Sequence, residues 1–537
     1  MTLGYLALVL HAHLPYVRHP EHPRPLEERW LHEALTECYL PLLSAFDRLE
    51  RDGVPFALSM SLTPPLAAML RDDLLRQRFH EHLARLEDLA DRETQRLAHD
   101  PELGPVARFY VDFLRGVRAR WDAIHGDVIA ALLHHQQAGR IELLGSSATH
   151  AYLPGLLPAH EGIRAQLRIG MRAFEQVTGR KPTGIWLPEC AYHPDFDEDL
   201  REAGVRYTLL DSHGITLARP RPPYGTHAPI ASPSGVVFFG RDVESSRQVW
   251  SRHEGYPGDA YYRDFYRDVG FELPEEALGE EIGPFGVRIM TGLKYHRITG
   301  PTDHKLPYIP SAAMQRAETH AGHFLDQRIA QVKRLAPRMP APPVVVAPYD
   351  AELFGHWWFE GPLFLEHFFR HLDRARKGGE TTLEAVTLGQ YLERSPVMVR
   401  AMPAASSWGA EGFGAVWVGP RSAHLWRHVH HATRYARYLA EKYRGIGGDR
   451  GRALDQLIRE LLLAQSSDWA FILTTGTVSD YAEARVRAHV HRLRHLAWLV
   501  QKEEALSPED LAWLDDVCAR DRFLAELPGD VLRSAFD

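Results

Sequence analysis

The chain opens with the apolar run Tyr5-Leu-Ala-Leu-Val-Leu10, which is followed at once by His11-Ala-His13. A short run without polar alternation is typical of a strand buried on both faces, as in a parallel sheet. Stretches with helical periodicity, such as residues 161–177, separate several similar runs. Strands that alternate with helices predict an α/β fold, and seven or eight of them favour a closed (β/α) barrel. The other candidate strands are residues 54–60, 141–144, 184–187, 205–210, 236–239, 287–290 and 344–347.

Two regions lack strand patterns. Residues 65–138 are charged and helical in period, which predicts a helical insertion between two barrel strands. Beyond about residue 420 the pattern is again helical, over residues 424–443, 452–464, 479–502 and 508–519. We therefore expect a barrel domain over residues 1–400 and a C-terminal helical domain over residues 401–537. A proline-rich loop (218–235) and an aromatic, glycine-rich link (406–419) are candidate binding loops.

Composition excludes several classes of protein. The chain has 537 residues, 45% of them hydrophobic, and a net charge of −8. Without a basic surplus, nucleic acid is not an expected partner. The three cysteines (Cys38, Cys190 and Cys518) are too few for a disulfide framework, and no apolar stretch reaches the length of a membrane span. The N-terminal run has no signal-peptide pattern. We expect a cytoplasmic protein without membrane contact, as a monomer or small homo-oligomer.

Polar residues follow several of the candidate strands. Carboxyl ends of strands carry the catalytic groups of (β/α) barrels. Glu189 and Asp350 each follow such a strand, and two carboxylates at one barrel mouth can flank a glycosidic bond, one as nucleophile and one as general acid/base. A single strand-end carboxylate is more often only a helix cap, but two together, with aromatic residues beside both, favour catalysis.

His11 and His13 leave a second interpretation open. Histidines two residues apart on a strand point to the same side, so they could bind a metal such as zinc. Further ligands could come from other strand-end residues, namely His150, Asp211, His213, His296 or Asp350. The alternative is that both histidines hydrogen-bond a polar ligand or the core, and their spacing does not decide between the two.

The 12 tryptophans and 31 histidines form an excess, for which core packing is the simpler explanation at any single residue. Trp186 lies near Glu189, and Trp357 and Trp358 follow Asp350. Trp408 and Trp417 lie in the glycine-rich link. Flat aromatic faces suit the apolar faces of sugar rings.

Five ordered motifs together resemble glycoside hydrolase family 57, and most closely its α-1,4-glucan branching enzymes. The resemblance covers nearly the whole chain from about residue 4. The motifs are His11-Ala-His13-Leu-Pro-Tyr, Gly145-Ser-Ser-Ala-Thr-His150-Ala-Tyr-Leu-Pro, Trp186-Leu-Pro-Glu189-Cys-Ala-Tyr, Tyr349-Asp350-Ala-Glu-Leu-Phe-Gly-His356-Trp-Trp and Ser407-Trp408-Gly.

The resemblance implies a (β/α)7 barrel with a helical insertion and a C-terminal helical domain that completes the substrate cleft. It implies retaining chemistry without metal or cofactor, with Glu189 as nucleophile and Asp350 as general acid/base. The chain taken from an α-1,4-glucan (amylose, amylopectin or glycogen) would pass to a 6-hydroxyl. The implied substrate-binding residues are His11, His13, His150, Arg267, Phe271, Trp408, Trp417 and Asp468; several relatives carry Trp in place of Phe271.

Three other functions remain open at this point. The nearest is an α-amylase or 4-α-glucanotransferase on the same scaffold. A more distant one is a metal-dependent hydrolase or deacetylase that uses His11 and His13. The last is a glucan-binding protein without catalysis.

Overall fold

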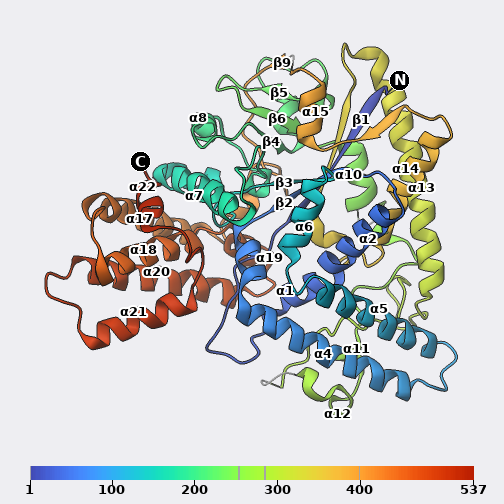
Figure 1. The fold of residues 1–537 in the computed structure, drawn as a ribbon, viewed down its shortest axis with the longest axis horizontal. Helices are drawn as coiled ribbons and strands as arrows, with labels where there is room; N and C mark the ends of the chain where they lie inside the picture. Colours follow the sequence, from blue (N-terminus) through green and yellow to red (C-terminus); the bar gives the residue numbers. More distant parts are fainter. Residues whose placement is uncertain (1, 252–253, 283–285, 398) are drawn as a thin grey trace.

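The computed structural model describes residues 2–251, 254–282, 286–397 and 399–537. Its core is built on two mainly parallel sheets, with strand orders β3-β2-β1-β7 and β4-β6-β5-β9, and β8 also pairs with β1. Figure 1 shows β2 and β3 near the middle of the larger lobe and β4, β5, β6 and β9 towards its top. The strands are β1 (Gly4–Ala12), β2 (Leu58–Leu62), β3 (Ile141–Leu144), β4 (Tyr207–Leu210), β5 (Ile230–Ala231), β6 (Val237–Gly240), β7 (Val344–Asp350), β8 (Leu383–Ala385) and β9 (Val399–Arg400).

The two sheets are joined into a ring. Residues 184–187 form parallel bridges to both sheets, from Ile185 to Gly145 and from Gly184 to Tyr207. On the opposite side, the Asp242 amide after β6 donates to the Val346 carbonyl of β7 at 2.8 Å. The strands β1, β2, β3, the segment 184–187, β4, β6 and β7 therefore enclose one barrel. This confirms the predicted (β/α)7 fold.

Alternate residues of β1 face the inside and the outside of the barrel. Ala7 and Val9 pack in one buried cluster with Trp186 and with strand residues of β4, β6 and β7. Leu6, Leu8 and Leu10 pack in a different cluster, against the surrounding helices. Both faces are buried, which is why the run lacks polar alternation. His11 continues the inward series of Ala7 and Val9, so its ring enters the barrel mouth.

Helices cover the outside of the barrel, and α13 packs against α14. The short π-helix Ala34–Tyr39 continues α1. The helices are α1 (Arg29–Glu33), α2 (Leu40–Arg51), α7 (Glu161–Thr178), α8 (Asp197–Glu202), α9 (Ser212–Thr216), α10 (Val243–Trp250), α11 (Val269–Glu272), α12 (Glu275–Leu278), α13 (Pro310–Leu335), α14 (Gly361–Lys377) and α15 (Leu388–Arg394).

Four helices lie between β2 and β3, where the helical insertion was predicted. They are α3 (Pro64–Arg71), α4 (Asp73–Arg96), α5 (Gly104–Ala123) and α6 (Val128–Gln137). The α4 helix begins where the Asp72 side chain accepts from the Leu75 amide, which satisfies one free donor of the first turn. The α4 and α5 helices pack on each other and project below the barrel in Figure 1.

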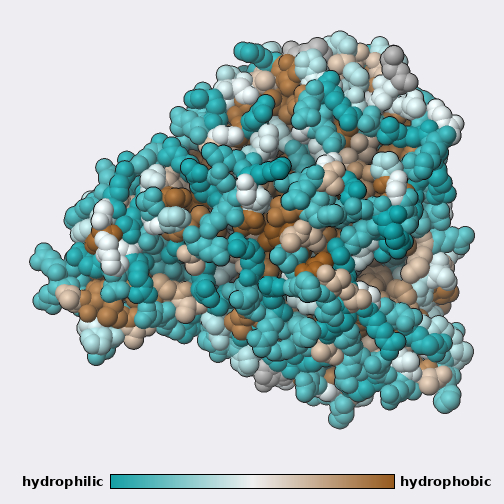
Figure 2. Space-filling view, in the orientation of Figure 1, coloured by the Kyte–Doolittle hydropathy of each residue, from teal (hydrophilic) through white to brown (hydrophobic). Residues whose placement is uncertain are grey.

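The C-terminal helices form a separate lobe, at the left of Figure 1. The α18 helix packs along α20, and α19, which the sequence pattern did not reveal, joins α16 and α20. Figure 2 shows hydrophobic side chains near the middle of this face, between the C-terminal lobe and the larger one. The helices are α16 (Ala415–Val418), α17 (Ala423–Lys442), α18 (Gly448–Ala464), α19 (Ser467–Thr475), α20 (Ser479–Gln501), α21 (Pro508–Arg520) and α22 (Gly529–Ser534).

One local prediction was wrong. Residues 287–290 are irregular and form no strand: they lie in a long excursion between β6 and β7, where none of them is fully buried and Val287 is 46% exposed. The proline-rich loop at 218–235 includes the two-residue strand β5 and a short 3-10 turn, and its role in binding stays a prediction. The predicted boundary between domains at residues 400 and 401 stays a prediction. None of the helices in the described ranges has the length and apolar character that a membrane span requires.

Candidate active site

Strands β1, β2 and β7 bring their polar ends together at one point. In the backbone register, His11 of β1 lies between Ser61 of β2 and Asp350 of β7. The predicted side chains of the barrel mouth therefore share a single rim. Glu189 reaches the same rim from the segment that follows residues 184–187, as its contacts show.

Glu189 is buried, with 8% of its surface exposed, and has an unusual backbone. Its φ is +63° and that of Cys190 is +47°, a conformation that costs a non-glycine residue about 1–3 kcal/mol. This turn aims the carboxyl at two donors. The Ser467 hydroxyl donates to Oε1 and the Trp408 indole donates to Oε2, both at 2.7 Å. The Trp408 amide also donates to the Glu189 carbonyl at 2.8 Å, which holds the two segments together.

The environment of Glu189 makes its ionisation costly. Burial raises the pKa of its carboxyl from 4.5 to about 7, and the nearby Asp468 charge acts in the same direction. The hydrogen bonds from Ser467 and Trp408 oppose this rise, because they stabilise the ionised form. The carboxylate thus receives two neutral donors and remains close to its titration point at neutral pH.

Asp350 ends β7 and is the second predicted carboxyl group. Burial raises its pKa well above the usual 3.8, and the charges of Glu352 and Glu189 add to the rise, while Arg241 opposes it. Among the described residues, none donates a hydrogen bond to its side chain. A carboxyl group in such surroundings favours the protonated form, as a general acid requires.

Three histidines complete the predicted cluster. The His11 ring stacks on Trp186 at 4.2 Å between centroids, and His13 stacks on His150 at 3.7 Å. His11 Nε2 and His150 Nε2 share a hydrogen bond of 2.9 Å, while His13 Nε2 lies 3.1 Å from Asp468 Oδ2. Burial lowers the pKa of both His11 and His150 well below 6.5. These two rings are therefore neutral at physiological pH.

Residues 7–401 of this chain match the family described as Glycosyl hydrolase family 57. The chain belongs to this family. Residues 428–530 match a second description, 1,4-alpha-glucan branching enzyme, C-terminal. This family 57 chain is also 34% identical to the 1,4-alpha-glucan branching enzyme TK1436 of Thermococcus kodakarensis, over 96% of its own length and 77% of that protein.

Solved structures carry the same fold along their whole length. The alpha-amylase AmyC from Thermotoga maritima is 39% identical, with a TM-score of 0.90 and 99% of each chain covered. The branching enzyme of the same family from Pyrococcus horikoshii is 33% identical, with a TM-score of 0.87 over 99% of this chain and 97% of that one. The relatives of this family 57 chain therefore include enzymes named for two reactions.

Trp417 belongs to the aromatic link but is covered by another ring. Only 1% of its surface is exposed, and it stacks on Tyr152 at 5.2 Å. Its face is thus unavailable to a sugar, so any effect on substrate would act through the position of Tyr152. Trp408 is more open and places its indole edge on Glu189.

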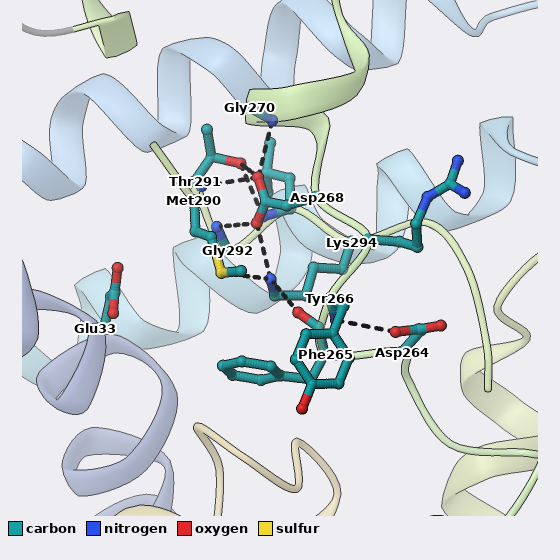
Figure 3. A network of polar contacts seen from close by, with 12 residues as sticks. Glu33, Asp264, Phe265, Tyr266, Asp268, Gly270, Met290, Thr291, Gly292 and Lys294 are labelled. Carbon is teal, nitrogen blue, oxygen red and sulfur yellow. Dashed lines mark hydrogen bonds and ion pairs between the residues drawn. The ribbon is translucent and has the colours of Figure 1, made fainter. Parts of the chain in front are cut away.

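Arg267 and Phe271 lie apart from the histidine cluster. The Arg267 side chain pairs with Glu272, and Phe271 is 53% exposed. Asp268 anchors this segment: its carboxylate accepts from Thr291, from backbone amides and from Lys294 Nζ at 3.0 Å (Figure 3). In the described part of the chain, no contact of Arg267 or Phe271 reaches Glu189, so their role in binding substrate stays a prediction.

His13, His150 and Asp468 are close enough to be considered as metal ligands. Their ligand atoms lie within 4.8 Å of one another. The two rings, however, are nearly parallel, with 18° between their planes. Imidazole lone pairs lie in the ring plane, so parallel rings direct them side by side and do not converge on one ion. The arrangement suits a hydrogen-bonding surface better than a metal centre.

Sequence patterns missed several polar residues of the site. Ser467 donates to Glu189, Glu352 accepts from the His13 amide at 3.3 Å, and Ser61 contacts His11. Two of them had a signal: Ser467 stands beside the predicted Asp468, and Glu352 lies within the quoted motif that contains Asp350. A lone serine carries too little chemistry to be singled out, and its position depends on where α19 docks.

Proposed function

We propose that this protein is a 1,4-α-glucan branching enzyme. The match of residues 428–530 to the region described as 1,4-alpha-glucan branching enzyme, C-terminal, carries this proposal, because that description names the reaction. The identity to TK1436, over 96% of the chain, supports it. The substrate would be an α-1,4-glucan such as amylose, amylopectin or glycogen.

The proposed reaction is a double displacement with retention. The Glu189 carboxylate attacks the anomeric carbon, the bond to the 4-oxygen breaks, and Asp350 gives its proton to that oxygen. The transferred chain is then an ester of Glu189. In the second step Asp350 accepts the proton of an acceptor 6-hydroxyl, whose oxygen attacks the same carbon and releases Glu189. The raised pKa of Asp350 supports its role as acid.

The predicted binding residues fall into three groups under this proposal. His11, His13 and His150 would bind the donor sugar beside Glu189. Trp408, Trp417 and Asp468 would shape the acceptor side, and Arg267 and Phe271 would contact the substrate further out. We also propose that residues 1–400 and 401–537 are the two domains that form the cleft.

Hydrolysis is the second candidate, because the alpha-amylase AmyC is 39% identical over 99% of the chain. Incubation of pure protein with amylose, followed by proton NMR, separates the two. New α-1,6 linkages are expected. Shorter linear chains alone would contradict branching and favour an amylase or 4-α-glucanotransferase.

Metal dependence has its own test. A deacetylase or other metal hydrolase that uses His11 and His13 would lose activity in EDTA and regain it with zinc. We expect unchanged activity after chelation and dialysis. Function without catalysis would instead leave every measurable property intact in Glu189→Gln.

We further propose that the protein acts in the cytoplasm, in glycogen synthesis, as a monomer or small homo-oligomer. The three cysteines form no disulfide in the described residues, which agrees with a reducing compartment.

A further inference from the structure

Five polar side chains form an unbroken line of short hydrogen bonds through the barrel mouth. Ser61 Oγ lies 2.6 Å from His11 Nδ1, and His11 Nε2 lies 2.9 Å from His150 Nε2. His150 Nδ1 lies 2.9 Å from Ser467 Oγ, which lies 2.7 Å from Glu189 Oε1. All five side chains are buried. The line crosses from β2, through β1, to α19 of the helical domain.

The carboxylate at one end determines the direction of every bond. An ionised carboxylate only accepts, so the single Ser467 proton must point at Glu189. Ser467 Oγ must then accept from His150 Nδ1–H. Because His150 is neutral, its Nε2 carries a lone pair and must accept from His11 Nε2–H. His11 is neutral too, so its Nδ1 accepts from Ser61.

The opposite direction fails at both ends. With every proton reversed, the Ser467 oxygen would face the Glu189 carboxylate at 2.7 Å with no proton between them. The Ser61 proton would also lose its acceptor in a fully buried position. Leaving a buried polar group unpaired costs about 1–3 kcal/mol. Reversal is therefore consistent only with a protonated Glu189.

We propose that Ser61, His11, His150 and Ser467 act as one directional donor chain that ends on Glu189, holds both imidazoles in single neutral tautomers and keeps the nucleophile ionised. Ser467 and Ser61 are positioning residues, since they act through Glu189 and His11. The inference rests on the proposed role of Glu189. It adds that the helical domain supplies the last link, so the nucleophile is complete only when α19 is docked.

Other charged and titratable groups also face Glu189 and influence its ionisation alongside the donor chain. They are His13 just after β1, His150, Tyr152, Asp350 on β7 and Asp468 on α19. His150 cannot replace the Ser467 proton at Oε1 directly, because its Nδ1 is 3.7 Å from that oxygen.

The tautomers are tested without any activity. Nitrogen-15 NMR of the full chain, labelled at histidine, reports which ring nitrogen carries the proton, and His11→Gln and His150→Gln assign the signals. At pH 8 we expect protons on His11 Nε2 and on His150 Nδ1. A proton on His150 Nε2, or an imidazolium at either ring, would overturn the proposed donor chain.

The effect on Glu189 is tested by the acid limb of kcat/KM, measured on whichever α-glucan reaction the protein catalyses. Ser467→Ala removes a hydrogen bond to a charged group, so a fall in kcat of about 10- to 100-fold is expected, with the limb moved to higher pH. Ser467→Thr keeps the hydroxyl and should restore the limb. An unmoved limb in Ser467→Ala would overturn the proposal, even if the protein proved to be an amylase.

Two serines on β2 form a matched pair that separates an effect of the donor chain from general destabilisation of the fold. Ser61 and Ser59 are both fully buried, but Ser59 donates to Glu142 at 2.8 Å, outside the chain. Ser61→Ala leaves His11 Nδ1 without its donor, so it should shift the His11 Nδ1 signal and move the acid limb upward, although it does not touch Glu189. Ser59→Ala should change neither. Equal effects of the two substitutions would contradict the proposed donor chain.

Discussion

Two buried glutamates of this protein have the same number of hydrogen bonds and opposite ionisation behaviour. Glu37, in the π-helix after α1, accepts from Arg263 at 2.8 Å and from His356 at 2.7 Å. Glu189 accepts from Ser467 and Trp408, both at 2.7 Å. Burial raises the pKa of each carboxyl, but Arg263 and His356 outweigh it at Glu37 and bring its pKa to about 2. At Glu189 the pKa is about 7.

The difference is the charge of the donors. A cation compensates a buried carboxylate, whereas neutral donors orient it and leave much of the cost of burial in place. Glu37 is thereby suited to hold the excursion between β6 and β7 onto the barrel. Glu189 is suited to react, since a nucleophile fully neutralised by an arginine would be a poor one.

The largest expected effect is on turnover. Glu189→Gln and Asp350→Asn should each lower kcat on amylose by about 10³- to 10⁵-fold, because each removes a group that the proposed reaction needs. Circular dichroism should show an unchanged fold. Azide should restore part of the activity of Glu189→Ala by acting as an external nucleophile. Full activity of either conservative variant would contradict the assigned roles.

Glu37→Gln should act on stability instead. Removal of one partner of a buried ion pair leaves Arg263 uncompensated and should lower the free energy of unfolding by about 3–5 kcal/mol. Urea denaturation measures this change. The control is Glu318→Gln, which removes the exposed pair with Arg374 at 3.3 Å and should change stability by less than about 1 kcal/mol. Similar changes in both variants would show that the buried pair of Glu37 is no more important for stability than an exposed one.

The pH dependence of stability should have opposite signs at the two sites. The folded pKa of Glu189 is raised, so its contribution to stability is present below pH 4.5 and is lost as pH rises to about 7. Over that window the loss is about 3 kcal/mol, at about 1.4 kcal/mol per pH unit. Glu37 contributes above pH 4.5 and loses its contribution as pH falls towards 2.

Glu189→Gln cannot ionise, so it should be more stable than the native chain at pH 8, by up to about 3 kcal/mol, and show no such gain at pH 4.5. Urea denaturation at the two pH values measures the difference. An equal difference at both values would mean that Glu189 titrates normally. Loss of activity below about pH 7 is the matching kinetic expectation.

The smallest effect is expected from Trp408→Phe. The ring is kept, but the donor to Glu189 Oε2 is lost, which should lower kcat by about 10-fold and move the acid limb to higher pH. Trp498→Phe, on the exposed face of α20, is the matched control and should leave the pH profile unchanged. A profile unchanged in Trp408→Phe would show that the indole only packs.

Sequence reasoning worked best where local pattern and environment agree. Runs such as residues 5–10 are strands because both faces are buried, and this requirement is visible in the chain itself. It failed at residues 287–290, a short run interrupted by Arg288 that forms no strand and is not fully buried. A short apolar run does not by itself separate a buried strand from an irregular, partly exposed segment.

The sequence alone therefore determined the barrel, its helical additions and the two carboxyl groups at strand ends, because these follow from periodicity and from motifs that lie together in the chain. Tertiary structure decided which groups reach Glu189. Ser467 and Ser61 are ordinary serines in the sequence, yet docking of α19 and the register of β1 with β2 place them at the two ends of one hydrogen-bond chain. Tertiary packing also buried Trp417 behind Tyr152 and gave Glu37 its arginine, so that one glutamate is stabilised as a carboxylate and the other is left ready to react.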